Sequence, residues 1–206
     1  MLNMDRVAIR FIAAGLALGA LLPMASAAQS AGGGAGADLA AAPAIETRAE
    51  KLDRLFGELA TAEPDEAAKI AEEIRGVWAR SGSDSMDLLL KRARSDMRLR
   101  RYDRARAHLS ALTRLAPDFA EGWNAAATLA YLQEDFARAM ADIERAVALE
   151  PRHFSALAGL AMVLERVGRP AAALKAWREI ERLHPTLDKA NEAIERLSPE
   201  VDGHAL

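Results

Sequence analysis

Apolar residues recur at helical spacing along most of the chain. Trp123, Ala127 and Ala130, for example, lie three or four positions apart, and a second apolar stripe begins at Phe136. These spacings place side chains on one face of an α-helix, whereas a half-buried strand alternates every second residue. The polar segment 133–135 between the two stripes is typical of a turn. The pattern therefore predicts a pair of helices joined by a short turn.

Three prolines, Pro117, Pro151 and Pro185, interrupt the pattern at intervals of 34 residues. Proline lacks a backbone N–H and ends a helix, and the apolar pattern restarts shortly after each one. With proline at position 32, the units are 86–119, 120–153 and 154–187. Positions 8 and 20 hold only alanine: Ala93, Ala127 and Ala161, then Ala105, Ala139 and Ala173. Two helices can pack closely at such small residues, so each unit is predicted to be a helix hairpin.

These residues resemble the tetratricopeptide repeat (TPR) family, whose pattern includes the 34-residue period, Trp123 at position 4, the alanines and the prolines. The resemblance implies an all-α fold, a short TPR α-solenoid of helix hairpins. It also implies a non-enzymatic protein–protein interaction module. The segments 77–93 and 150–160 are similar to those of exported proteobacterial TPR proteins associated with cell-envelope maintenance.

The segments on either side of the three units also carry helical apolar stripes. Residues 46–85 are predicted to form an N-terminal helical cap pair that covers the exposed face of the first unit. Residues 188–206 are predicted to form a C-terminal capping helix and a tail.

The first residues have the features of a secretory signal peptide. Arg6 and Arg10 precede the apolar run 11–22, and a small-residue cleavage site ends at Ala27. The run is shorter than the roughly 20 residues that span a bilayer, which disfavours the alternative of an uncleaved anchor. We therefore expect a signal peptide over 1–27, location in the periplasm and no stable membrane insertion after cleavage.

Composition limits the kinds of linkage, partner and activity expected of the chain. Residues 28–45 are rich in Gly and Ala and predict a flexible linker. The chain has no cysteine, which excludes a lipoprotein anchor and disulfides. Its net charge of −3 does not suggest a nucleic-acid partner. The four histidines accompany no catalytic or metal-binding motif, so we expect no enzyme and no cofactor, and His153 is interpreted as a turn residue between units.

The stretch 91–114 is strongly basic, with nine Lys or Arg residues against Asp96 and Asp103. One interpretation is a solvated face whose arginines meet acids of the cap pair. Another is a ligand-binding face, because Lys91, Arg94 and Arg98 have the spacing i, i+3 and i+7.

The resemblance implies that the first helix of each unit lines a concave groove. The groove columns hold a basic and amide-bearing set that is similar to sites for an extended peptide or its carboxylate. The candidate peptide-binding residues are Lys91, Arg94 and Arg98 from the first unit and Asn124, Thr128 and Tyr131 from the second. The expected partner is a periplasmic or envelope protein. An alternative is an anionic envelope polymer or lipid bound by the 91–114 stretch.

Arg92 occupies a packing column of the first unit. A buried arginine without a partner is costly. We therefore expect Arg92 to be partly buried, with Glu58, Glu72 or Glu73 of the cap pair close to it.

Overall fold

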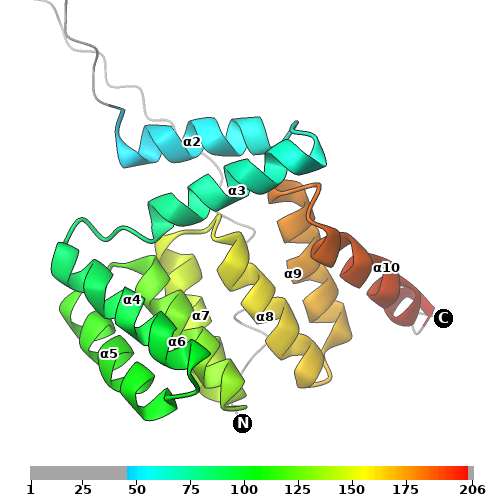
Figure 1. Ribbon diagram of the computed structural model, residues 1–206. Helices are drawn as coiled ribbons and strands as arrows, with labels where there is room; N and C mark the ends of the chain where they lie inside the picture. The colour runs from blue at the N-terminus through cyan, green and yellow to red at the C-terminus, as the bar shows by residue number, and fades with distance from the viewer. Residues whose placement is uncertain (1–45, 204–206) are drawn as a thin grey trace, which may run out of the picture. The chain divides into compact units, whose positions relative to one another are not determined.

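The computed structural model describes residues 46–203, with the side chain of Asp202 left aside. This part of the chain contains nine helices, labelled α2 to α10, and no strand, which confirms the all-α prediction (Figure 1). None of these helices is long and apolar enough to cross a membrane. The predicted signal peptide and linker, and residues 204–206 of the tail, lie outside the described residues.

Each of the three predicted units forms a helix hairpin. The pairs are α4 (Asp84–Arg98) with α5 (Tyr102–Leu115), α6 (Ala120–Leu132) with α7 (Phe136–Leu149), and α8 (Phe154–Arg166) with α9 (Pro170–Leu183). The three turns share one backbone feature, because Arg100, Glu134 and Gly168 all have φ between 55° and 71°. All three occupy position 15 of their units, so the left-handed conformation that closes the hairpin is repeated even where the residue is not glycine.

The alanine columns are the places where the helices approach. Ala93, Ala105, Ala139, Ala161 and Ala173 are fully buried, and Ala127 is nearly so. Successive hairpins stack side by side, as Figure 1 shows from green through yellow to orange. The last helix, α10 (Asp188–Gly203), packs on α9 through Ala190 and Leu197, as expected for a capping helix.

The N-terminal helix pair consists of α2 (Arg48–Leu59) and α3 (Pro64–Trp78) and is called the arm below. Thr47 begins α2 through a capping box with Glu50. The facing apolar stripes of the two helices are buried in the main core. The prediction of a helix pair within residues 46–85 therefore agrees with the structure.

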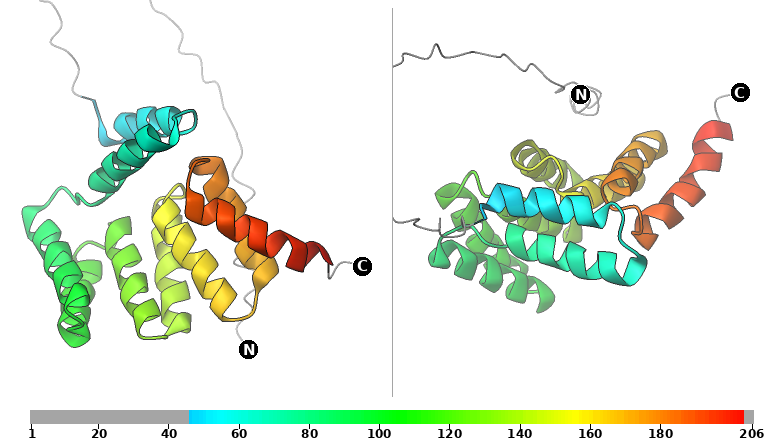
Figure 2. Two further views of the ribbon diagram at one scale, coloured as in Figure 1. Left: turned by 45° about the vertical axis from the view of Figure 1, so that its right-hand side comes forward. Right: turned by 90° about the horizontal axis from the view of Figure 1, so that it is seen from above.

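The predicted position of the arm, over the exposed face of the first unit, is wrong. The arm instead contacts the turn between the second and third units. The ring centre of Trp78 lies 4.0 Å from that of His153 and 4.8 Å from that of Phe154. Asp53 forms an ion pair with Arg152 at 2.7 Å. Figures 1 and 2 show the arm, in cyan, leaving the outer side of α4 uncovered.

The small residues of the second unit explain this difference. Positions 3 and 7 of the second unit are Gly122 and Ala126, which lie under α5. A Cβ on Gly122 would come within 3.3 Å of the Leu112 side chain. The first unit has Leu88 and Arg92 in these columns, which are too large for such close packing.

The prediction that Arg92 is partly buried is therefore wrong, because no helix covers its column and the side chain is exposed. The three acids expected near it have other partners: Glu58 pairs with Arg54, Glu72 with Arg75, and Glu73 with Lys51. Among residues 46–203, the acids of the arm do not form ion pairs with the basic stretch 91–114.

Candidate functional site

The first helices of the three units, together with α3 and α10, line a groove made of adjoining hollows. The first, called the polar hollow, measures about 410 Å³ and lies between α3, α4 and α6. The second, called the apolar hollow, measures about 320 Å³ and lies between α3, α6, α8 and α10. The two share four lining residues, which makes them parts of one groove: Arg75, Asn124, Thr128 and Ser155.

A buried carboxylate organises the polar hollow. The side chain of Glu121, on α6, is only 6% exposed and forms an ion pair with Arg94 of α4. Asn124 donates to both Glu121 carboxylate oxygens, at 3.1 and 3.2 Å. The Nε2 atom of His153 lies 2.8 Å from the second of these oxygens. Glu121 thus satisfies its hydrogen-bonding capacity with three neighbouring side chains.

His153 connects this carboxylate to the arm. Its Nδ1 accepts the backbone N–H of Ala156 at 3.3 Å and caps the start of α8. With Nδ1 accepting, a proton on Nε2 is donated to Glu121. Trp78 covers the ring in a near-parallel stack with an interplanar angle of 16°. One contact network therefore ties α3, α4, α6 and α8 together.

The environment of Glu121 keeps it ionised. Burial alone would raise the pKa of its carboxyl group. The hydrogen bond from His153 and its electrostatic attraction, followed by the positive charge of Arg94 and the hydrogen bond from Asn124, outweigh burial, and the pKa lies below its ordinary value.

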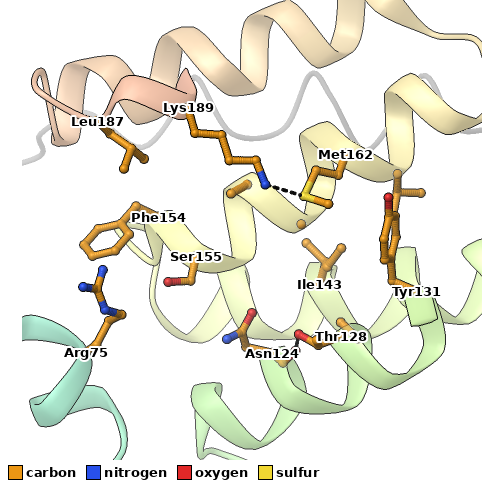
Figure 3. Close-up of a pocket in the computed structure, with 14 residues that line it drawn as sticks. Arg75, Asn124, Thr128, Tyr131, Ile143, Phe154, Ser155, Met162, Leu187 and Lys189 are labelled. Carbon is orange, nitrogen blue, oxygen red and sulfur yellow. Dashed lines mark hydrogen bonds between the residues drawn. The ribbon is translucent and has the colours of Figure 1, made fainter. Parts of the chain in front are cut away.

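The apolar hollow has a different lining. Its floor is formed mainly by apolar side chains: Ile143, Phe154, Met162 and Leu187. Lys189 enters from the first turn of α10, with its Nζ 3.2 Å from the sulfur of Met162 (Figure 3). Arg75 enters from α3, and its guanidinium lies 5.9 Å from the centre of the Phe154 ring.

The groove continues past the apolar hollow along α8 and α10. A third hollow of about 300 Å³ shares Tyr131, Met162 and Lys189 with the apolar hollow. Here Glu165 accepts hydrogen bonds from Trp177 at 2.7 Å and Arg196 at 2.6 Å. This end of the groove therefore has its own satisfied polar group.

The family is decided by comparison with known sequences. The tetratricopeptide repeat family model matches residues 90–149 and 124–188. A TPR repeat-containing protein of Rhizobium etli is 36% identical over 156 residues, which covers 75% of this chain and 76% of that protein. The chain belongs to the TPR family.

Solved TPR structures have the same fold. The first TPR of Spaghetti (RPAP3), bound to the HSP90 peptide SRMEEVD, has a TM-score of 0.55 at 18% identity, covering 57% of this chain and 93% of that one. The TPR2B domain of yeast Sti1 in a pHsp70 complex has a TM-score of 0.53 at 16% sequence identity, and the match covers 57% of this chain and 99% of that one. The MamA protein has a TM-score of 0.53 at 19% sequence identity, and the match covers 77% of this chain and 84% of that one.

The predicted binding residues fall into three groups, two inside the TPR groove and one outside it. Arg94 and Asn124 lie in the polar hollow, but both are bonded to Glu121. Thr128 and Tyr131 line the apolar hollow, where the Thr128 hydroxyl donates to the carbonyl of Asn124 at 2.9 Å. The remaining two predicted cations, Lys91 and Arg98, are exposed and do not belong to the lining of either hollow.

Four residues of the site were missed by sequence reasoning: Arg75, Glu121, His153 and Lys189. Glu121 is an acid at position 2 of a repeat, in a helix that otherwise holds mostly small apolar residues. That contrast is a signal for a buried, paired carboxylate. Arg75 and Lys189 lie outside the repeat units, so the repeat register gave them no place in the groove.

The described part of the chain contains no group of three His, Asp, Glu or Cys side chains that could hold a metal ion. The polar clusters around Glu121 and Glu165 are ion pairs and hydrogen bonds that join helices. The TPR fold is typically a non-catalytic interaction scaffold, and no enzyme family is indicated.

Proposed function

We propose that this TPR protein is a non-enzymatic adaptor of the periplasm, with a role in cell-envelope maintenance, and that it binds a segment of a protein partner in its groove. The observation that carries the proposal is the continuous run of hollows along α4, α6, α8 and α10. Two TPR neighbours are described in complexes with HSP90 and Hsp70 ligands, which supports a protein ligand for the same fold.

A photo-crosslinking amino acid tests this proposal in cells of the native host. Thr128 lies where the polar and apolar hollows meet, whereas Ala141 is exposed on α7, outside the lining of the three hollows. We expect a probe at position 128 to form a crosslinked band with one protein, and a probe at position 141 to form none. Crosslinks of equal strength at both positions would contradict groove binding.

The cellular location needs its own measurement. We expect the mature chain in the periplasmic fraction, with an N-terminus at Ala28 by mass spectrometry. A cytoplasmic protein that retains residues 1–27 would exclude the periplasmic part of the proposal.

A second candidate function is binding of an anionic polymer or lipid surface by the stretch 91–114. The observation in its favour is that Arg92 is exposed and has no acid of the arm as partner. Leu88, on the same helical stripe, and Leu99, just after the end of α4, are 45% and 56% exposed. Vesicle co-sedimentation with and without anionic lipid separates the candidates, because multiple cation contacts lose strength steeply as salt rises.

A further inference from the structure

Lys189 carries a positive charge into the groove without a carboxylate partner among residues 46–203. Its Nζ contacts the sulfur of Met162, which is only a weak acceptor, and lies 6.0 Å from the Trp177 ring. The side chain is exposed and reaches over the apolar hollow (Figure 3). Lys189 is therefore a cation in the groove that forms no ion pair within residues 46–203.

Arg75 supplies a second cation from another element. In the described residues its ion pair is with Glu72, one turn earlier on α3, where the Glu72 side chain is 75% exposed. An exposed pair of this kind contributes only a few tenths of a kcal/mol. A carboxylate bound in the groove would therefore displace Glu72 at small cost.

The floor between the two cations is suited to an apolar side chain. Ile143 is fully buried, and Phe154 is packed against Trp78 and His184, so these walls are fixed by the core. Ala158 and Gly159 leave space above Ile143. A volume of about 320 Å³ lies at the lower end of the range for sites that enclose a ligand, about 300–1,000 Å³.

We propose that the groove selects an extended acidic–apolar peptide segment, with a large apolar side chain in the apolar hollow and flanking carboxylates on Lys189 and Arg75. This inference rests on the proposed groove-binding function. Both cations come from outside the three repeats, one from the arm and one from the capping helix. The charge complementarity distinguishes this ligand from a basic or uncharged segment.

A positional peptide array tests this chemistry directly. The probes are immobilised decapeptides in which five central positions vary among Asp, Lys, Leu and Ser, and the purified protein is applied at physiological salt. We expect retained peptides to be enriched in Leu with Asp on both sides. Lys189→Glu should weaken binding of the selected peptide about tenfold and change the preferred residue at one flank from Asp to Lys.

Arg75→Glu should change the preference at the other flank, and Arg98→Glu is the matched control. Arg98 is an exposed cation outside the lining of the hollows, so its reversal should leave the selected sequence unchanged. Ala158→Phe should fill the hollow and abolish the preference for Leu while acids stay selected. Thermal melting of each variant verifies that the fold is intact.

The possible failures are distinguishable. Retention of peptides without a preference for Asp, or an equal effect of Arg98→Glu, would overturn the acidic–apolar inference and leave groove binding in place. Retention of no peptide, combined with no crosslink from position 128, would overturn both.

Discussion

The polar and apolar hollows lie side by side in one groove, yet their charged residues have different roles. In the polar hollow, Arg94 is bonded to the buried Glu121, which also binds Asn124 and His153. In the apolar hollow, Lys189 has a sulfur atom as its close polar neighbour. The first set of contacts joins helices, and the second leaves a charge available for a ligand.

This difference shows that a count of cations along a sequence overestimates what a groove offers to a partner. The strongly basic stretch 91–114 contributes one cation to the hollows, Arg94, and that cation is already neutralised. A single lysine outside the repeats has more unused bonding capacity. The predictions below test whether the two hollows differ in stability and in function as this comparison requires.

The largest expected effect is from Trp78→Ala. Trp78 is 1% exposed and contacts His153, Phe154 and Phe56. Its removal leaves a cavity at the junction of the arm with α8 and should lower the free energy of unfolding by about 3–5 kcal/mol. Denaturation with urea measures the loss.

Trp123→Ala is the matched control, because Trp123 is only partly buried and its indole N–H donates to the carbonyl of Pro117. The control should cost less than half as much. Equal losses from both tryptophans would mean that the arm does not stabilise the polar hollow.

Glu121→Gln should have the next largest effect. The neutral amide leaves Arg94 without its counter-charge, and its NH₂ group cannot accept from His153 and Asn124. We expect a loss of about 1.5–3 kcal/mol, the usual range for hydrogen bonds to charged groups.

The pKa of Glu121 is lowered in the folded protein, so its contribution is present above about pH 4.5 and disappears as the pH falls through the folded pKa. Wild type and variant should therefore converge in stability in acid. Glu134→Gln, at an exposed pair with Arg166, is the control and should stay within about 0.5 kcal/mol of wild type. Parallel stability curves down to acid pH would contradict this assignment of Glu121.

Replacement of single cations should have smaller effects on stability, and these effects should differ between Arg94 and the other two cations. Arg94→Gln should destabilise the protein by about 1–2 kcal/mol, because it leaves the Glu121 carboxylate with one charged partner fewer. Arg98→Gln and Lys189→Gln should each change stability by no more than about 0.5 kcal/mol. Chemical denaturation of the three variants at neutral pH provides the measurement, and a similar loss in all three would remove the distinction between the hollows.

The smallest expected effect is a change with pH at His184. This side chain is 4% exposed, and its Nδ1 has no hydrogen-bond partner in the described structure. Burial, and then the positive charge of Arg75, lower the pKa of His184 in the folded state. Its unfolded-state pKa is about 6.5, so stability should decrease as the pH falls from there through the folded pKa.

The variant His184→Phe should remove this decrease, because phenylalanine keeps the contact with Phe154 and does not titrate. Denaturation midpoints at several values between pH 7.5 and 5 test the idea. A variant that retains the wild-type slope would assign the pH dependence to another group.

The repeats could be predicted because their causes are local in the sequence. Proline ends each second helix, and alanine at positions 8 and 20 lets the two helices of a unit approach. These features predicted the three hairpins, and an apolar stripe at helical spacing predicted the capping helix. The position of the arm depends on contacts between Trp78 and residues 153–154, which no periodicity encodes.

The site was predicted only in part for the same reason. The spacing of Lys91, Arg94 and Arg98 predicted that they share one face of a helix. The ion pair of Arg94, however, depends on Glu121, which lies 27 residues away on α6, the first helix of the second unit. Lys189 and Arg75 reach the groove because α10 and the arm fold back onto it. Such approaches depend on tertiary packing, which a single repeat does not specify.

The contact of the arm with the turn between the second and third units also constrains the order of folding. Asp53 and Arg152 are 99 residues apart in the sequence, whereas most contacts of a helical repeat join near neighbours. Closing so long a loop is slower than forming a hairpin. Among the described helices, those of the arm are synthesised first, but their apolar stripes have no complete binding surface until residues 152–154 have been made. We therefore expect the first helices of the described chain to be the last to reach their final position.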